Sequence, residues 1–299
     1  MDNLKIAVIG SIGKWSTEAL AQAIAKKAGT CLVVDMSQVV YDLSSASLRY
    51  QEQNLCEFDA LVVKKLSSRH SSHSLDKLEL LHIAEQAGVP IFNNSIHSLP
   101  LLNRLSCTLT LAKAGIPMPP TRITEDFAQA LIAVEDFGCA VFKPLYSTKA
   151  RGMTVISKKK EFYKIKQEIH AFQVANPVMY IQQKMQLGGQ DLGLVFLAGQ
   201  YLGCYARISK EGEWNTSTHN GGRYAAYQPS DEVIALAAKA QALFKLDFAT
   251  VDIAETEAGA VVFEVSAFGG FKGAKEGIGI DVPQLYADYV VNTLLAKRQ

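Results

Sequence analysis

The chain has 299 residues, 48% of them hydrophobic, which is enough to bury a full core and to build two or three compact units. Its 30 basic and 29 acidic residues give a net charge of +1, so the totals exclude a bulk electrostatic attraction to nucleic acid or to an anionic membrane. The partner is therefore expected to be small or to be recognised locally.

The cysteines and the N-terminus indicate the compartment. The five cysteines are scattered, odd in number and without a CxxC spacing, which argues against a disulfide framework or a zinc site. The first ten residues, MDNLKIAVIG, have no basic region before their apolar run, and no stretch approaches the roughly 18 apolar residues of a membrane-spanning helix. We therefore expect a cytoplasmic protein.

Strands and helices alternate over the first hundred residues. Short apolar runs predict strands at residues 4–9, 30–36, 59–64 and 89–92. Apolar residues at helical spacing predict helices at 16–28 and 75–87, the second capped by Ser74. This alternation is typical of an open parallel sheet with helices on both faces, and the crevice at its strand ends is the expected binding edge.

Lysines follow two of these predicted strands. The loop Gly10–Ser16 contains Lys14, but it fails the GxxxxGK[ST] spacing of a phosphate-binding P-loop. Lys64 and Lys65 follow the third strand. We expect Lys14 and Lys65 to face an anionic substrate, and a solvated strand-to-helix connection is the alternative for both. The serine-rich run at residues 67–74 is assigned to a mobile loop rather than a metal site, despite its two histidines.

A proline-rich linker separates a second unit from the first. A helix at residues 101–114 ends at Gly115, and IPMPP follows. A strand near 121–123, a helix after Thr124 and the strand AVFKP then lead to Lys143 at a strand exit. Residues 145–153 offer hydroxyl groups, two cations and a glycine, so we expect a lid over a polyphosphate; a surface hairpin turn is the alternative.

The remaining chain predicts an antiparallel sheet. An exposed helix at 158–175 precedes a buried strand at 178–183, and strands at 192–197 and 201–207 alternate around the turn AGQ. A helix at 231–244, a hairpin and an amphipathic helix at 282–297 complete the chain.

The hairpin, TVDIAETEAGAVVFEVSAFGG at 250–270, carries the candidate metal ligands. A three-residue loop at 257–259 would pair Val251 with Val265 and Ile253 with Phe263, and would place Asp252 directly opposite Glu264. Two opposed carboxylates repel each other and call for a cation between them, and hard oxygen ligands suit Mg²⁺ bound with substrate phosphates. The alternative is an ordinary hairpin with its polar face in water.

Taken in order, these features resemble the ATP-grasp superfamily, especially ligases like the ribosomal-protein S6 glutamate ligase and its amino-acid-carrier relatives. The resemblance covers nearly the whole chain through GIPMPPT, FKP and its following loop, QDLGLVF, WNTSTHNGG and VDI…EVS. The strings GKWSTE, VDM, VKK, NRLSCTLTLAKAGIPMPPTR and KPLYSTKARGM resemble most closely the ATP-grasp component of GAK systems, which also contain an HprK-like kinase and an amphipathic-helix protein.

The resemblance implies a mixed α/β and α+β architecture in three parts. An N-terminal pre-ATP-grasp open parallel sheet would occupy residues 1–100. A two-part ATP-grasp domain with antiparallel sheets would follow, with its small subdomain at 101–181 and its C-terminal, metal-bearing subdomain at 182–299.

The resemblance also implies roles for individual residues. ATP and Mg²⁺, with Mn²⁺ as an alternative ion, would be the cofactors. The implied metal ligands are Asp252, Glu264 and Ser266, and the implied catalytic residues are Arg207, Lys143 and Arg104. The implied nucleotide-binding residues are Arg104, Lys143, Ser147, Thr148, Lys149, Gly152, Gln182, Gln183, Lys184, Met185 and Asp191. The expected substrate-facing residues are Lys14, Lys65, His219, Gly221, Gly222 and Arg223.

Three positions depart from the family pattern. Asn103-Arg104 replaces the usual Asp-Lys, and Arg104 keeps the positive charge with a different geometry. Gln183 replaces a common Glu. Ser266 replaces the usual metal-binding Asn and is a shorter, neutral ligand, which bears on whether one or two metal ions bind.

The function implied is an ADP-forming ligase that joins a carboxylate to an amine. The substrates would be an amino acid and a peptide or protein acceptor, and the amphipathic-helix protein is a candidate partner. Two alternatives stay open: a phosphotransferase on the same scaffold, and a non-catalytic nucleotide-binding module. The apolar faces of the first unit are compatible with a homodimer.

Overall fold

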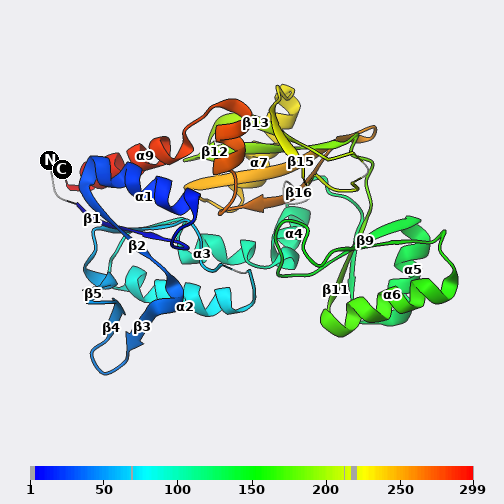
Figure 1. Ribbon diagram of the computed structural model, residues 1–299, viewed down its shortest axis with the longest axis horizontal. Coiled ribbons are helices and arrows are strands. Elements are labelled where there is room, and N and C mark those ends of the chain that lie inside the picture. The colour runs from blue at the N-terminus through cyan, green and yellow to red at the C-terminus, as the bar shows by residue number, and fades with distance from the viewer. Residues whose placement is uncertain (1–3, 69, 212, 217–220, 299) are drawn as a thin grey trace.

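The computed structural model describes residues 4–68, 70–211, 213–216 and 221–298. Four sheets and their covering helices build an elongated molecule, with the parallel sheet at one end and helices α5 and α6 at the other (Figure 1). Within the described residues, no helix has the length and apolar character that crossing a membrane requires. The predicted mixed α/β architecture is confirmed.

A parallel sheet forms the first part of the chain. Its strand order is β2-β1-β6-β7, and every described pairing in it is parallel. Helices α1 and α9 lie side by side on one face (Figure 1), while α2 packs with the other face. The bounds are β1 Leu4–Ile9, α1 Trp15–Ala28, β2 Gly29–Val34, β6 Ala60–Val63, α2 His73–Gln86, β7 Ile91–Phe92 and α9 Val282–Arg298.

Short elements branch from this sheet. The sequence did not predict the small antiparallel sheet β3-β4-β5, which packs over the α2 side. Its strands are β3 Val39–Asp42, β4 Ser47–Tyr50 and β5 Gln53–Asn54, next to the 3-10 turns Met36–Gln38 and Leu55–Glu57. The predicted cap of α2 is wrong, because the helix begins at His73 after Ser72 and Ser74 is buried within its first turn.

The second sheet has the strand order β10-β9-β11-β8 and is antiparallel. Helices α5 and α6 cover the face that carries Phe142 and Ile181. Because side chains alternate along a strand, Lys143 and Gln182 lie on the opposite face, where both are buried. The bounds are β8 Thr121–Thr124, α5 Phe127–Phe137, β9 Cys139–Lys143, β10 Thr154–Ser157, α6 Phe162–Ala175 and β11 Met179–Gln183.

The helix that leads to this sheet begins later than predicted. Residues 99–101 form a 3-10 turn after the short helix α3, Ser95–Ser98, and α4 spans Arg104–Lys113. The Asn103 side chain caps it by accepting a hydrogen bond from Leu105 N at 2.8 Å, which explains the boundary.

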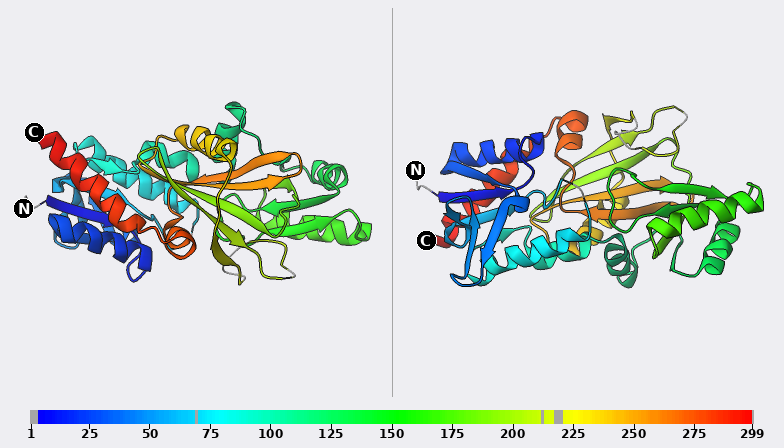
Figure 2. Two further views of the ribbon diagram at one scale, coloured as in Figure 1. Left: turned by 90° about the horizontal axis from the view of Figure 1, so that it is seen from above. Right: turned by 60° about the horizontal axis from the view of Figure 1, so that its bottom comes forward.

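The largest sheet has the order β14-β13-β12-β15-β16 and is antiparallel. Helices α4 and α7 pack with one face, and α8 with the other. Figure 2 shows this sheet between the parallel sheet and the second sheet, β10-β9-β11-β8. The bounds are β12 Gln190–Leu197, β13 Gln200–Ile208, β14 Arg223–Ala226, α7 Asp231–Ala242, β15 Phe248–Thr256, β16 Gly259–Ser266 and α8 Phe271–Ile278.

The register of the hairpin β15–β16 agrees only in part with the predicted register. Val251 pairs with Val265 and Asp252 with Glu264, as predicted. However, the predicted Ile253–Phe263 pair is wrong, because Thr256 pairs with Gly259 across a turn one residue shorter than predicted. A bulge after Asp252 absorbs the extra residue, so that Ile253 pairs with Val262 and Phe263 is left over.

Candidate active site

The bulge at Phe263 shapes the site face of the hairpin. Val262 and Val265 are both buried in the core under α7, so the two residues between them, Phe263 and Glu264, lie on the opposite face. Asp252 lies on that same face, since its neighbours Val251 and Ile253 also belong to the α7 core. The opposed carboxylates that the sequence predicted are therefore present on a rigid strand pair.

Each carboxylate on this face has an arginine partner. Arg104, at the start of α4, donates to Glu264 Oε2 at 3.0 Å. Arg207 of β13 lies 2.8 Å from Asp252 Oδ2, and its Nε and Nη2 donate to the two oxygens of Asp191 at 2.9 and 2.6 Å. Burial raises the pKa of Asp252, Arg207 lowers it and Glu264 raises it further. The two carboxylates thus face each other between two guanidinium groups.

Lys143, the last residue of β9 in the second sheet, also reaches this face. Its side chain is 9% exposed, Nζ donates to Gln182 Oε1 at 2.5 Å, and Nζ lies 5.1 Å from the centre of the Phe263 ring. Burial, and then the nearby Arg104, lower the pKa of Lys143 to about 7, while Glu264 acts in the opposite direction. The predicted nucleotide-binding lysine and the predicted metal ligands are therefore neighbours.

Gln182 is held by three partners on the same sheet. Its Nε2 donates to Thr121 Oγ1 at 2.9 Å and to Tyr180 Oη at 3.2 Å, while its Oε1 accepts from Lys143. The next two residues continue the connection to the large sheet, with Gln183 N donating to Pro120 O and Lys184 N to Cys139 O. Gln183 ends β11, and Lys184 and Met185 begin the segment that leads to β12; adenine binding was predicted for these residues.

The predicted lid connects β9 to β10. Its residues Lys149, Ala150 and Gly152 have φ angles of 59°, 57° and 70°, so the loop is tightly turned, and Arg151 donates to Thr148 Oγ1 at 2.8 Å. The Ser147 hydroxyl is buried and has no hydrogen-bond partner among the described residues. A buried hydroxyl without a partner, in a loop predicted to cover a polyphosphate, fits an added oxygen-rich ligand.

Lysines of the first sheet lie near this loop. Burial lowers the pKa of Lys65, and the neighbouring charges that lower it further are Lys149, Arg151 and Lys14. We call these four residues the basic cluster. The two strand-end loops that the sequence assigned to an anionic substrate are thus brought together with the lid.

The donor set fits one magnesium ion. The candidates are two opposed carboxylates, with the Ser266 hydroxyl two positions along the same strand. Ser266 Oγ accepts from Phe268 N at 3.3 Å. No cluster of three or more His, Cys, Asp or Glu side chains suited to a metal occurs in the described part of the chain, so further ligands would have to be phosphate and water oxygens, as is usual for Mg²⁺.

Other predicted residues lie on or next to the edge strand β14. Arg223 starts β14 and pairs with Ile208, and Gly221 approaches the Lys210 side chain. Gly222 lies between Gly221 and Arg223 in the chain. His219 lies outside the described residues. Of the two noted histidines, His70 Nε2 lies within hydrogen-bond distance of Leu102 O, at 2.6 Å.

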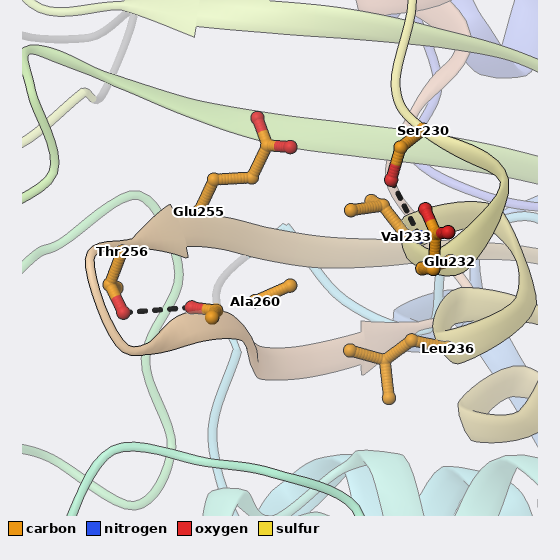
Figure 3. Close-up of a pocket in the computed structure, with 8 residues that line it drawn as sticks. Ser230, Glu232, Val233, Leu236, Glu255, Thr256 and Ala260 are labelled. Carbon is orange, nitrogen blue, oxygen red and sulfur yellow. Dashed lines mark hydrogen bonds between the residues drawn. The ribbon is translucent and has the colours of Figure 1, made fainter.

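Two hollows occur away from the carboxylates. One, of about 380 Å³, lies between the first turn of α7 and the tip of the hairpin, on the α7 face (Figure 3). The other, of about 510 Å³, is lined by parts of β13 and β14 and by Ile278 and Ile280. Neither is lined by a predicted site residue, so the site is defined by its converging charges rather than by these hollows.

Sequence reasoning missed several residues of the site. Phe263 was assigned to the buried face, and only the bulge brings it to Lys143. Thr121 and Tyr180 were treated as strand residues, and their alternation with apolar neighbours was the available signal.

The comparisons with known proteins agree with this architecture. The profile of the RimK-like ATP-grasp domain matches residues 102–290. A probable alpha-L-glutamate ligase of Klebsiella pneumoniae (strain 342) is 26% identical over 287 residues, covering 93% of both chains. A ribosomal protein bS6–L-glutamate ligase of Escherichia fergusonii is 25% identical, again covering 93% of both. The structure of the ATP-grasp ligase PsnB with a precursor variant, Mg and ADP superposes with a TM-score of 0.76 at 18% identity, covering 98% of this chain and all of that one.

A parallel sheet followed by two antiparallel sheets is the fold shared with this ATP-grasp structure, and lysine, arginine and carboxylate side chains converge between the two antiparallel sheets. The chain belongs to the RimK-like ATP-grasp family, whose profile matches well over half of its length. The predicted enzyme class, an ATP-grasp ligase, is confirmed by these matches.

Proposed function

We propose that this protein is an ATP-dependent carboxylate–amine ligase that works through an acyl phosphate. The observation that carries the proposal is the convergence of Lys143, Arg104 and Arg207 on the face that holds Asp252 and Glu264. These are the charges needed at a transferring phosphoryl group. The names of the relatives, which are glutamate ligases, support the same reaction class.

The site residues are assigned by their positions. Asp252 and Glu264, with Ser266 as a candidate third ligand, would hold Mg²⁺ or Mn²⁺, which when bound neutralises phosphate charge. Lys143, Arg104 and Arg207 would bind the phosphates, and Gln182 to Met185 and Asp191 would bind the nucleoside. In this assignment the three parts are residues 1–100, 101–181 and 182–299.

The reaction balances without a side-chain nucleophile. A substrate carboxylate oxygen attacks the γ-phosphorus of ATP, and ADP leaves. The amine nitrogen then attacks the acyl carbon, phosphate leaves, and the nitrogen loses a proton to give the amide. Residues of the lid, Ser147 to Gly152, would exclude water from the acyl phosphate, which would otherwise hydrolyse.

The basic cluster bears on the carboxylate substrate. The charges of Lys149, Arg151 and Lys14 each lower the pKa of Lys65, so an anion bound beside Lys65 would stabilise its charged form. We propose that the acid to be activated is anionic beyond its reacting carboxylate, or belongs to an acidic peptide or protein. The bS6 ligase and the precursor-bound PsnB are relatives whose names support a peptide or protein acceptor. An amphipathic-helix protein remains the candidate partner.

The test is a substrate screen. ADP release and the mass of the products are measured with candidate acids and amines, singly and in pairs, with Glu264→Ala as the blank. A ligase releases ADP in quantity only when both substrates are present and yields a product lighter by one water than their sum. A phosphorylated acceptor formed without an amine would show a phosphotransferase instead. Nucleotide binding without turnover of any acceptor would favour a non-catalytic module.

A further inference from the structure

Lys64 is a buried lysine to which the proposed reaction gives no role. It follows β6, is 2% exposed, and has no carboxylate partner among the ion pairs of the described residues. Its Nζ donates to Phe268 O at 2.6 Å and lies 3.4 Å from Gly269 O and 4.0 Å from the centre of the Phe271 ring. Burial, with a contribution from Lys65, lowers its pKa to about 7. Burying an amine costs desolvation free energy, and the contacts of Lys64 with the two carbonyl oxygens and the ring offset this cost.

The carbonyl oxygens that Lys64 binds belong to the turn directly after the hairpin β15–β16. Phe268 N donates to Ser266 Oγ at 3.3 Å, so the same residue contacts both Lys64 and a proposed metal ligand. Two residues on, Gly270 has φ of 86°, and a Cβ there would lie 2.2 Å from Thr250 Cγ2. Thr250 is the register partner of Ser266. The turn is therefore packed tightly against the strand pair, and a shift in it would reach Ser266.

A second side chain of the first sheet fixes the base of the hairpin. Asn93, directly after β7, accepts from Phe248 N at 2.9 Å and donates to Phe248 O at 3.0 Å and Ala267 O at 3.2 Å. These bonds join the start of β15 to the end of β16. Asn93 thus holds the base of the hairpin through these hydrogen bonds. Lys64 binds the next turn, whose residue Phe268 contacts Ser266.

We propose that Lys64 is a positioning residue for the metal site: it anchors the Phe268–Gly269 turn to the parallel sheet and so sets the placement of Ser266 and Glu264. The inference rests on the proposed function. Lys64 also connects the proposed metal ligands to the basic cluster, because the main-chain N–H groups of Lys64 and Lys65 both donate to Ile9 O, at 2.9 and 3.0 Å. The turn behind the metal ligands and a residue of the basic cluster therefore share one anchor at the end of β1.

The test measures metal binding directly. Free Mn²⁺ is followed by electron paramagnetic resonance during titration of the full-length protein with saturating ADP. Side chains that orient metal ligands usually contribute 10–100-fold to metal affinity. We expect Lys64→Met to raise the Mn²⁺ dissociation constant about tenfold while leaving metal-free ADP affinity within twofold. A general loss of stability would not produce this difference between metal and nucleotide in the folded protein.

A control and a second variant complete the design. Lys5→Met removes another lysine that lies over an aromatic ring, Phe58, in the same sheet but away from the hairpin, and it should leave Mn²⁺ affinity unchanged. Lys64→Gln keeps N–H donors on a shorter side chain and should raise the Mn²⁺ constant several-fold if Lys64→Met does not fold. Wild-type Mn²⁺ affinity in any folded Lys64 variant would overturn the inference. Absence of nucleotide-dependent Mn²⁺ binding in the wild type would instead overturn the proposed function.

Discussion

Replacing Arg207 with methionine tests the charge arrangement of the site most directly. Arg207 is the only described ion-pair partner of both Asp191, which is 7% exposed, and Asp252. Arg207→Met would leave two buried carboxylates on neighbouring strands without a countercharge. Removing one member of a buried ion pair typically costs about 3–5 kcal/mol. At roughly 2 °C per kcal/mol for a chain of this size, the melting temperature should fall by about 6–10 °C.

The assay is thermal and urea denaturation of the metal-free protein at pH 7. Arg122→Met is the matched control, because Arg122 pairs with Asp136 at 2.6 Å at the surface and should contribute less than about 1 kcal/mol. Adding Asp191→Asn to Arg207→Met removes one uncompensated charge and should restore part of the loss.

The pH dependence of the variant has a definite sign. Burial raises the pKa of Asp252 and Arg207 lowers it, so without Arg207 the folded-state pKa of Asp252 rises further. At pH values between the unfolded-state and folded-state pKa of Asp252, the folded protein therefore binds more protons than the unfolded chain. The stability deficit of Arg207→Met is therefore present at high pH and narrows as the pH falls from 8 to 5.5. A loss no larger than that of Arg122→Met would refute the assignment of Arg207 as the countercharge of this site.

Three further predictions concern ligands. Lys143→Met should weaken ATP binding at least about tenfold in isothermal titration, because the buried amine would bind phosphate in a site of low polarity; unchanged affinity would contradict its role. Since burial lowers the pKa of Lys143 to about 7 and phosphate binding needs the charged amine, ATP affinity should fall by up to about tenfold per pH unit above pH 7. The accompanying proton uptake is measured in buffers of different ionisation enthalpy, and it should vanish in Lys143→Arg. Lys65→Glu should raise the KM for the acid substrate about tenfold and leave the KM for ATP within twofold. Lys26→Glu, a control at an exposed position of α1, should change neither KM.

The register of the metal hairpin shows how far local sequence reasoning reaches. The alternation of apolar and polar residues predicted that Asp252 faces Glu264, and the structure confirms it. The predicted turn was one residue too long, yet the carboxylate pair was still right because the bulge at Phe263 offsets the shorter turn. Periodicity defines which residues share a face, but a bulge reverses the face of every residue between it and the turn, here including Val262 and Phe263, and has no distinct signature in an isolated strand.

The partners of the charged side chains were harder to predict. Arg104 and Glu264 lie 160 positions apart, and Lys64 lies 204 positions from Phe268, so no local pattern could pair them. The strand-end position of Lys64 was visible in the sequence, but whether its amine faced substrate or the interior depended on how the first sheet packs against the last. Such contacts are set by the packing of whole sheets rather than by the residues around each side chain.

The charges around the hairpin explain why binding of the acid substrate and binding of the nucleotide should depend on different lysines. Lys143 and the two arginines lie beside three carboxylates, so the hairpin itself is nearly neutral before any ligand binds. A magnesium-bound nucleotide triphosphate adds about two negative charges, and an anionic acid adds more. The hairpin cannot balance both, and Lys65, whose pKa is lowered by burial and by the nearby Lys149, Arg151 and Lys14, would be stabilised in its charged form by an added anion. Lys65 follows a strand of the parallel sheet, whereas Lys143 ends β9 of the second sheet. Loss of Lys65 should therefore weaken mainly the binding of the acid, and loss of Lys143 mainly the binding of ATP.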